Sequence, residues 1–495
     1  MKQKKVIVVG AGIGGLASTL QLAHVGYEID VYETHSMPGG KLRTVESPQG
    51  PVDAGPTVFT LKHIFNDLFR TVGEDMEDHL TLKQERVLAR HFWPDGTMLD
   101  LSSDVNQNYK ALRDFGGSKA VEEFRSFHEL SKKLYESFNE TILHNPNPSL
   151  TSTISQTLKS ALSIAPALLP GRTLANLVRS HFSDKRLRQL FSRYATYVGG
   201  SPFNSPAILS LIWYAESLGV WKVNGGMHEL AKALVTLAKK RDARFHFNCQ
   251  VSEILISNNK IRGIRLKDGK EIFSDYVIFN GDPNALFTGL LGRQATKLIH
   301  RKNVQARSLS AYVWTFAASV SSTELTHHNV FFNEVYKSEF DDISAGMIPE
   351  DPTLYVCAQN LEKPIDLSTI NKFEIIMNAA PFLNSNLSEE EEFNICQERT
   401  FGTLKKMGLR FKPTPELETL TTPRKFSQLF PASNGSLYGL NPQKLMTTYM
   451  RPQARTKVVG LYLTGGGVHP GPGIPMALLS GRHAAATIMR DQTLI

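Results

Sequence analysis

Close to its N-terminus the sequence reads Val6-Ile7-Val8-Val9-Gly10-Ala11-Gly12-Ile13-Gly14-Gly15. The short apolar run at 6–9 is β-branched, which is typical of a parallel strand buried on both faces. The GxGxxG pattern follows. Gly10 permits a tight turn, Gly12 lets the backbone approach a pyrophosphate, and Gly15 lets the next helix pack against the strand. The pattern predicts a strand, a glycine turn and a helix that together bind a dinucleotide.

The residues after this turn support the same interpretation. Leu16, Leu20 and Ala23 share one face of a helix expected from about 14 to 24. The N-terminus of that helix would offer free N–H groups and a positive dipole end to a diphosphate. Residues 28–32 predict a second strand, and Glu33 follows it directly. An acid there can accept hydrogen bonds from both hydroxyls of the adenosine ribose. A glycine-rich turn without a ligand would leave Glu33 unexplained.

Length and composition limit the class of protein. At ~100–200 residues per domain, 495 residues suggest two to four domains or one composite fold. With 41% hydrophobic and 21% charged residues, the chain is neither disordered nor fibrous. Cys249, Cys357 and Cys396 lie far apart, so we expect neither a disulfide framework nor a metal site, and a reducing cytoplasm fits.

The net charge of +8 is concentrated in one segment. A basic patch attracts polyanions, either nucleic acid or an anionic lipid surface. No nucleic-acid fold signature accompanies it, so we expect a lipid surface and no nucleic acid. Residues 151–200 contain a single acid, Asp184, and these basic residues: Lys159, Arg172, Arg179, Lys185, Arg186, Arg188 and Arg193.

We expect no membrane-spanning segment and no cleaved signal. Residues 6–23 follow a basic start and are largely apolar, which superficially fits a signal peptide. They also contain four glycines and three polar residues, which the strand–turn–helix pattern explains better. The expected location is cytoplasmic, with peripheral association with a membrane.

Two further glycine-rich turns follow the second strand. The first is Pro38-Gly39-Gly40-Lys41-Leu42-Arg43-Thr44, and the second is Val52-Asp53-Ala54-Gly55-Pro56-Thr57-Val58. Such turns suggest a backbone that passes close to a flat cofactor, although they could also be two surface turns. The first resembles the Gly-Gly element of FAD-dependent amine oxidases and carotenoid desaturases. In those families it continues the FAD site, and a basic side chain at the Lys41 position neutralises the diphosphate.

Two later segments resemble the remainder of such a cofactor domain. Residues 221–282 predict a helix and several strands, and in the FAD families the residue matching Val251 contacts the adenine through its backbone. Residues 460–488 predict a strand, a glycine-rich turn with His469 and Met476, and a helix. In amine oxidases an acid at the Gly466 position usually binds the ribityl chain. Glycine cannot do so, which argues against an amine oxidase.

The chain resembles the phytoene desaturase-type carotenoid oxidoreductases over nearly its full length. Within that family it is most similar to the 1-hydroxycarotenoid 3,4-desaturases, also called methoxyneurosporene dehydrogenases, through residues 90–96, residues 467–470 and Met476. The resemblance implies an α/β fold with a Rossmann-like FAD-binding domain, a mixed α+β substrate domain and a helical membrane-facing part. The elements that carry the family resemblance are residues 10–15, 39–40, 52–57, 194–202, 225–227 and 469–475.

This resemblance also implies a division of the chain and a set of cofactor ligands. We expect a discontinuous FAD-binding domain from 1–75, 215–290 and 450–495, a helical membrane-facing region at 76–214, and a substrate domain of sheet and helices at 291–449. The expected FAD-binding residues are Gly10, Gly12, Gly15, Glu33, Gly40, Lys41, Arg43, Gly55, Pro56, Thr57, Val251, Gly466 and Met476.

The intervening segments suit a lipid substrate. Apolar residues recur every three or four positions at 121–143, and Leu150, Ile154, Leu158 and Leu162 step by four before the basic run. Such an amphipathic element can lie in a membrane interface, although it could equally be a core-facing helix beside a solvated basic face. Residues 312–318, 354–358 and 373–380 predict strands of the substrate domain, and Ser388 predicts a helix cap.

The expected reaction is the desaturation of an acyclic carotenoid. FAD would accept the hydride, with oxygen or a quinone as the final electron acceptor, and an apolar tunnel would hold the polyene. The polyene itself can stabilise a cation, so a strong protein base is unnecessary. His469 is either a proton acceptor or an anchor of its loop. Phytoene or diapophytoene desaturation, another flavin oxidase activity, and non-enzymatic lipid binding of the Rab GDP-dissociation inhibitor type stay open.

Overall fold

The computed structural model describes residues 3–157, 161–321, 324–362, 365–382 and 387–493. Its nucleotide-binding part is built on a five-stranded parallel sheet in the order β20-β13-β1-β2-β9. The short apolar run at the N-terminus is the central strand, as its buried β-branched pattern predicts. The strands are β1 (Lys5–Val9), β2 (Glu28–Tyr32), β9 (Arg244–His246), β13 (Tyr276–Phe279) and β20 (Leu461–Leu463).

Both faces of this sheet are covered. Val6 and Val8 pack into a core with the helices, whereas Ile7 and Val9 pack against a three-stranded antiparallel sheet. The alternation follows from the two-residue repeat of a strand. The covering helices are α1 (Ile13–His24), α2 (Lys62–Thr71), α9 (His228–Lys239) and α15 (Ile474–Thr493), and the covering strands are β10 (Val251–Ser257), β11 (Lys260–Leu266) and β12 (Glu271–Phe273).

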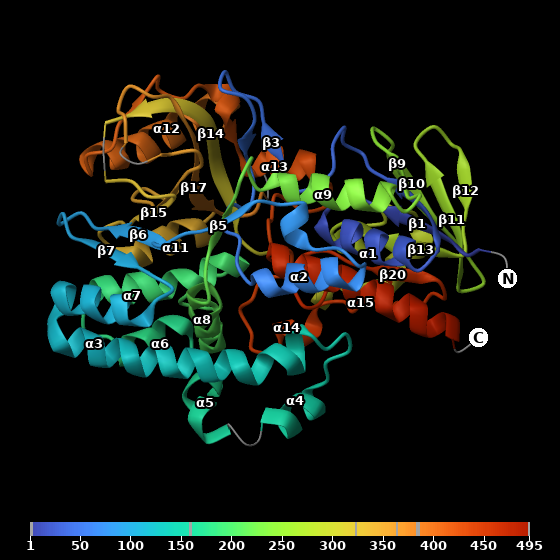
Figure 1. Cartoon of the computed structure of the whole chain (residues 1–495), viewed down its shortest axis with the longest axis horizontal. Coiled ribbons are helices and arrows are strands. Elements are labelled where there is room, and N and C mark those ends of the chain that lie inside the picture. Colours follow the sequence, from blue (N-terminus) through green and yellow to red (C-terminus); the bar gives the residue numbers. More distant parts are fainter. Residues whose placement is uncertain (1–2, 158–160, 322–323, 363–364, 383–386, 494–495) are drawn as a thin grey trace.

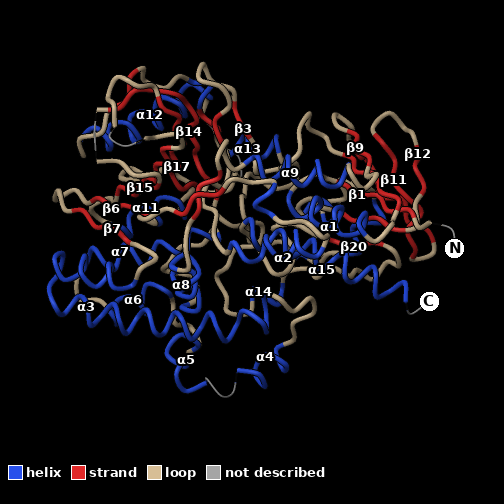
Figure 2. Tube along the Cα trace, viewed as in Figure 1, coloured by secondary structure: helices blue, strands red, loops and turns tan. Residues whose placement is uncertain are grey.

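A second, eight-stranded mixed sheet forms the other part, and Figure 2 shows the strands in separate groups with loops between them. Its expected strands at 312–318, 354–358 and 373–380 are confirmed. It consists of β6 (Ala89–Phe92), β7 (Met98–Leu101), β14 (Ser310–Val320), β15 (His328–Phe331), β16 (Leu354–Ala358), β17 (Asn371–Ala379), β18 (Phe411–Lys412) and β19 (Leu420–Thr421).

The two faces of this second sheet have different neighbours. Phe373, Ile375 and Met377 of β17 pack in a core with α12 (Glu389–Lys406), whose predicted Ser388 cap is present. The alternate residues Glu374 and Ile376 face a large cavity. The other helices near this sheet are α11 (Tyr336–Ser344) and α13 (Pro423–Leu429).

A helical layer lies below the sheet in Figure 1. The range 76–214 was expected to be helical, but it also contributes two strands to the second sheet. Strand β6 pairs with β15, and β7 pairs with β6. Pro166 lies inside α5, and the helix continues past it to Leu168. The elements are α3 (Val105–Phe138), η2 (Asn139–Leu143), α4 (Leu150–Thr157), α5 (Ala161–Leu168), α6 (Leu174–His181), α7 (Lys185–Ser192), η4 (Arg193–Val198), η5 (Ala207–Ser210) and α8 (Leu211–Ser217).

Among the described residues, no helix combines the length and the apolar character needed to cross a membrane. Leu158, one of the four apolar positions of the expected amphipathic segment, lies outside the described residues.

Candidate active site

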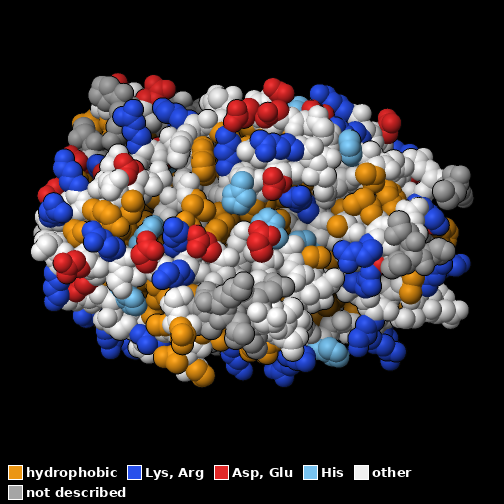
Figure 3. Space-filling view, turned by 60° about the horizontal axis from the view of Figure 1, so that its bottom comes forward, with side chains coloured by type: hydrophobic (Ala, Val, Ile, Leu, Met, Phe, Trp, Pro, Cys, Tyr) orange, Lys and Arg blue, Asp and Glu red, His pale blue; other side chains and the backbone are white. Residues whose placement is uncertain are grey.

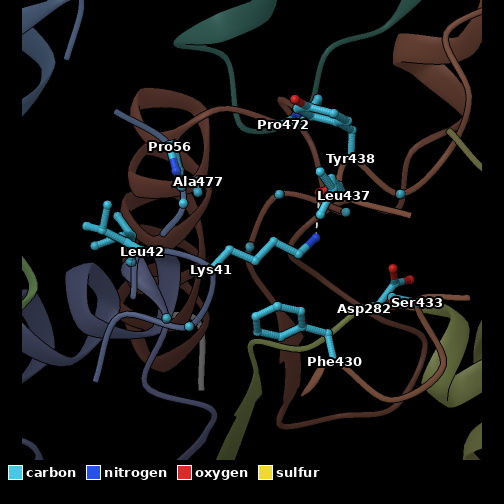
Figure 4. Close-up of a pocket in the computed structure, with 18 of the residues that line it drawn as sticks. Lys41, Leu42, Pro56, Asp282, Phe430, Ser433, Leu437, Tyr438, Pro472 and Ala477 are labelled. Carbon is cyan, nitrogen blue, oxygen red and sulfur yellow. Dashed lines mark hydrogen bonds between the residues drawn. The ribbon is translucent and has the colours of Figure 1, made fainter. Parts of the chain in front are cut away.

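One cavity of about 810 Å³ joins the nucleotide-binding part to the second sheet. It begins at the carboxyl ends of the parallel strands, where α/β sheets bind their ligands, and it extends to the cavity-facing residues of β17. Its volume falls within the ~300–1,000 Å³ usual for ligand sites. Figure 4 shows part of the lining, with side chains from distant parts of the sequence converging on one space.

The glycine turn after β1 borders this cavity. Gly12 is the N-cap of α1, and no side chain caps the helix there, so its first N–H groups face a ligand site. A Cβ on Gly12 would lie 2.8 Å from Nδ2 of Asn280, and one on Gly15 would lie 2.3 Å from the carbonyl oxygen of Gly10. Gly10 and Gly12 therefore line the cavity, whereas Gly15 allows the helix to pack closely, as expected.

Asn280 holds this turn in place and was assigned no role from the sequence. Its Nδ2 donates to the carbonyl oxygen of Gly10 at 3.1 Å, and its side chain also lines the cavity. Its position directly after β13, the strand that pairs with β1, could have indicated that it lies near the glycine turn.

Glu33 lies buried at the end of β2 and lines the cavity. Its carboxylate accepts hydrogen bonds from the backbone N–H of Ala11 at 2.7 Å and of His35 at 2.9 Å. These two bonds fix the carboxylate before any ligand binds. The position fits the expected contact with the adenosine ribose.

The next turn brings Lys41 into the cavity but not Arg43. The Lys41 ammonium donates to the carbonyl oxygen of Leu437 and lies 5.7 Å from the centre of the Phe430 ring (Figure 4). Burial lowers the pKa of Lys41 to about 8, so an anion beside it would be a favourable partner. Arg43 does not line the cavity, because its guanidinium donates to Thr421 Oγ1 at 3.0 Å.

The turn at 55–57 packs against the preceding one. A Cβ on Gly55 would lie 2.0 Å from the carbonyl oxygen of Lys41, so only glycine fits. Gly55, Pro56 and Thr57 all line the cavity, and a 2.8 Å hydrogen bond joins Thr57 Oγ1 to the Tyr355 hydroxyl. This bond links the turn to the second sheet.

The remaining expected ligands divide into two groups. Gly40, Val251 and Gly466 line the cavity, whereas Met476 is absent from its lining and packs partly buried beside the core of the nucleotide-binding part. Arg451, which was not predicted, donates to the carbonyl oxygen of Gly466 at 3.3 Å and so holds the C-terminal glycine turn.

His469 is buried but does not line the cavity. Its Nε2 donates to the carbonyl oxygens of Ile142 and Asn145, at 3.0 and 2.9 Å, and burial lowers its pKa to about 4. These contacts favour the loop-anchoring alternative over proton transfer from a substrate in the cavity.

The far half of the cavity mixes apolar and polar walls. Ile212, Val313, Val330 and Ile376 suit a hydrocarbon chain. Glu374 is fully buried there, neither carboxyl oxygen has a hydrogen-bond partner within the described chain, and burial raises its pKa well above the usual range. Burial therefore favours the neutral, protonated form of the Glu374 carboxyl over the charged form.

Arg193 also lines this half, which corrects its expected place on the basic surface. Only 7% of Arg193 is exposed, because η4 turns it inward toward Tyr197 and Glu216. Arg186 is also less free than expected, since it pairs with Asp184 and its guanidinium lies 4.0 Å from the centre of the Phe115 ring.

Three potential metal ligands lie together beside the cavity, although the sequence predicted no metal site. The ligand atoms of His327, His328 and Cys357 are within 4.8 Å of one another. They already have protein partners: His327 Nδ1 donates to the Ala358 carbonyl oxygen, His328 Nδ1 bonds the Tyr355 hydroxyl, and the Cys357 thiol faces His327 Nε2. Burial raises the pKa of Cys357, so the thiol stays protonated. This group is hydrogen-bonded within the protein, and none of its three side chains lines the cavity.

These residues fit a flavin dinucleotide. An uncapped helix N-terminus, two glycine turns with close backbone approach, and the Lys41 ammonium suit a diphosphate. The fixed Glu33 carboxylate suits a ribose. Beyond them the cavity continues to residues of the second sheet, such as Val313 and Ile376.

Comparisons with known proteins agree with this geometry. The family model for flavin containing amine oxidoreductase matches residues 13–312. A hydroxyneurosporene desaturase of Cereibacter sphaeroides is 47% identical over 98% of both chains, and a 1-hydroxycarotenoid 3,4-desaturase of Flavobacterium sp. is 33% identical over 98% of this chain and 99% of its own. Cyclohexylamine oxidase from Brevibacterium oxydans shares the fold, with a TM-score of 0.60 at 14% identity over 99% of this chain and all of its own.

The identity to the desaturases extends over nearly the whole chain, whereas the likeness to the amine-oxidising structure is one of fold alone. FAD is accordingly the cofactor of this enzyme. The chain belongs to the flavin-containing amine oxidoreductase family and, within it, to the carotenoid desaturases.

Proposed function

We propose that this enzyme introduces a C=C bond at C-3,4 of an acyclic 1-hydroxycarotenoid in an FAD-dependent reaction. The observation that carries the proposal is the single cavity, which connects the glycine turns and Glu33 to an apolar wall on β14, β15 and β17. The names of the similar relatives supply the substrate class. Phytoene or diapophytoene desaturation is the alternative reaction.

In this proposal the protein binds FAD, orients the carotenoid and shields the reacting bond from water. Gly10, Gly12, Glu33, Gly40 and Lys41 hold the nucleotide half of FAD through backbone N–H groups, a carboxylate and an ammonium. The turn at 55–57, Val251 and Gly466 border the rest of the cofactor. When bound, FAD supplies the hydride acceptor for the desaturation. Gly15, Arg43 and Met476 act by packing behind this site.

The apolar wall positions one bond of the polyene and excludes water from it. The proton released with the hydride needs no strong base in the wall, because the polyene delocalises the positive charge. Electrons then leave to an external acceptor, oxygen or a quinone. We infer that the cofactor part comprises 1–75, 215–290 and 450–495, and that 76–214 and 291–449 shape the substrate half.

We also propose that the enzyme docks peripherally on the cytoplasmic face of a membrane. Figure 3 shows a face on which hydrophobic side chains stand among Lys and Arg. Leu162 on α5 is 95% exposed, and Leu150 and Leu169 nearby are also exposed. The helix α5 packs against η5, which leads into α8, and α8 lines the cavity. A carotenoid dissolved in lipid would enter along this path.

The test is turnover by the purified enzyme. The protein is reconstituted with FAD in lipid vesicles and incubated anaerobically and aerobically with a panel of acyclic carotenoids. We expect loss of two hydrogens from a 1-hydroxycarotenoid, seen as a red shift of its absorption and a mass lower by two hydrogens. Faster turnover of phytoene or diapophytoene would establish the alternative reaction. Carotenoid binding without any turnover would support a lipid carrier instead.

A further inference from the structure

A cluster of three polar side chains lies in the substrate half of the cavity. The Arg193 cluster consists of Arg193 and Tyr197 on η4 and Glu216 on α8. Nη1 of Arg193 donates to the Tyr197 hydroxyl at 3.1 Å, and that hydroxyl donates to Oε1 of Glu216 at 3.0 Å. Tyr197 thus connects a guanidinium to a carboxylate.

The internal bonds of the Arg193 cluster leave both ends unsatisfied. Nε and Nη2 of Arg193 and Oε2 of Glu216 are buried and meet no hydrogen-bond partner among the residues that the structure describes. Arg193 is 7% exposed and Glu216 3%, so neither is a surface charge. The cluster therefore presents donors and an acceptor side by side.

The surrounding wall makes this arrangement costly if the ligand is a pure hydrocarbon. Ile212 and Ala215 on α8 and Val330 on β15 line the same half of the cavity. A polyene that displaces water from these walls would leave the free N–H groups and the free carboxylate oxygen without partners, which disfavours its binding. A ligand with one oxygen function among its carbons would satisfy them.

We propose that the Arg193 cluster binds the hydroxyl group of the carotenoid substrate and thereby selects hydroxylated over hydrocarbon carotenoids. The inference rests on the proposed function and deepens it. A free N–H of Arg193 donates to the substrate oxygen, and the substrate O–H donates to Oε2 of Glu216. Tyr197 does not touch the substrate but fixes both partners, so it is a positioning residue.

The Arg193 cluster lies where a bound hydroxyl group would bring the 3,4 bond of the substrate close to the cofactor. Burial raises the pKa of Tyr355, and the nearby Tyr197 hydroxyl adds to this effect. Tyr355 also bonds Thr57, in the turn that borders the cavity. In a 1-hydroxycarotenoid the carbon that carries the hydroxyl is two bonds from the nearer carbon of the 3,4 bond. A hydroxyl anchor near the cofactor turn would place that bond against the cofactor.

The test compares three substrates that share one polyene: the 1-hydroxylated form, its methyl ether, and the hydrocarbon. Each is measured in the same vesicles for kcat/KM and for equilibrium binding, which is followed by the absorption shift of the bound polyene. We expect wild type to prefer the hydroxylated form over the hydrocarbon by at least about 100-fold. The methyl ether accepts a hydrogen bond but donates none, so it should rank between them.

The variants are Tyr197→Phe and Arg193→Met, with Tyr312→Phe as the matched control. Tyr312 also donates to a buried glutamate, Glu392, but it does not line the cavity. Tyr197→Phe should lower kcat/KM for the hydroxylated form by about 10–100-fold and change that for the hydrocarbon by less than about 3-fold. Arg193→Met should raise hydrocarbon binding. The control should keep the wild-type preference.

Each outcome bears on the inference separately from the proposed function. The role of the cluster would be overturned if wild type showed the same kcat/KM and the same affinity for all three ligands. It would also be overturned if Tyr197→Phe lowered kcat/KM equally for all three while its FAD content stayed intact. Hydroxyl-dependent binding without any desaturation would support the cluster and refute the proposed reaction.

Discussion

The carboxylate of Glu33, at the end of β2, accepts a 2.7 Å hydrogen bond from the backbone N–H of Ala11, in the glycine turn after β1. This bond joins the turn that would bind the diphosphate to Glu33, the acid that would bind the ribose. Because the second oxygen is held by His35 N–H, the carboxylate keeps its orientation without a ligand. Preorganisation of this kind favours tight cofactor binding.

Replacing Glu33 should therefore weaken FAD binding. Glu33→Ala removes an acceptor for the ribose and frees two N–H groups, so FAD affinity should fall by about 1.5–3 kcal/mol, the scale of a hydrogen bond to a charged group. Titration of the apoprotein with FAD measures the change. The control is Glu28→Ala on the same strand, which removes only a partly exposed ion pair with Arg244. Equal affinities of Glu33→Ala and wild type would remove Glu33 from the site.

Even a methyl group on Gly12 should reduce flavin retention. Its Cβ would lie 2.8 Å from Nδ2 of Asn280, and it would occupy space at the helix N-terminus where a diphosphate approaches. We expect Gly12→Ala to lose most of its flavin on gel filtration, and Gly12→Val to retain none. In Gly402→Ala, the control on α12, the new Cβ meets no atom within 4 Å among the described residues outside its own stretch of helix, so flavin content should match wild type. Full flavin occupancy in Gly12→Val would contradict the assignment of this turn.

Acid should destabilise the anchor between the helical layer and the C-terminal glycine turn. His483 on α15 also anchors η2, because its Nε2 donates to the Leu143 carbonyl oxygen at 3.0 Å. Burial lowers the pKa of His469 and of His483 to about 4, so the unfolded chain takes up protons first as the pH falls below 6.5. Stability is therefore complete above about pH 6.5 and declines toward pH 4, by up to about 3 kcal/mol per ring.

Urea unfolding at about pH 7.5 and about pH 5 measures this effect. His469→Gln keeps an N–H donor for the carbonyl oxygens of Ile142 and Asn145 but cannot titrate, so its unfolding free energy should depend less on pH than that of wild type. His24→Gln, at an exposed position, should follow wild type. An unchanged pH dependence in His469→Gln would show that its ring is not the titrating group.

Membrane docking should depend on the exposed leucines of the α5 region. Leu162→Glu combined with Leu169→Glu should lower binding to anionic vesicles by at least about 10-fold while FAD content stays unchanged, because neither leucine lines the cavity. The control is Phe273→Glu, a 61% exposed apolar residue on β12. Equal flotation of the leucine variant and the control would locate docking elsewhere.

In the docking that we propose, the electrostatic part would rest on fewer charges than the sequence suggested. Arg179 and Lys185 are exposed, whereas Arg193 is buried and Arg186 is paired. Neutralisation of both charges in Arg179→Gln with Lys185→Gln should remove about 1 kcal/mol per residue at low salt, and screening should erase the difference at high salt. Cosedimentation at both salt concentrations separates this contribution from the apolar one.

Local patterns sufficed to predict the nucleotide-binding half. The apolar strand, the glycines at 10, 12 and 15, and the acid at 33 occupy the predicted elements, because turn geometry, strand burial and helix packing depend on residues close together in the chain. Asn280 went unassigned because its partner, Gly10, is 270 residues away. Nothing in the local pattern indicates which asparagine will reach that turn.

The substrate half depended on tertiary structure. In the sequence Arg193 is one of seven basic residues in a charged segment, and Glu216 and Glu374 are unremarkable acids. Arg193 and Glu216 line the cavity only because η4 and α8 pack beside the second sheet. Glu374 faces the same cavity only because of the register of β17. The sequence by itself determined the strand, the glycine turn and the acid that we propose to bind the dinucleotide, because short-range geometry specifies these elements. The polarity of the substrate cavity was decided by the tertiary structure, because burial of a charge is a property of the segments packed around it.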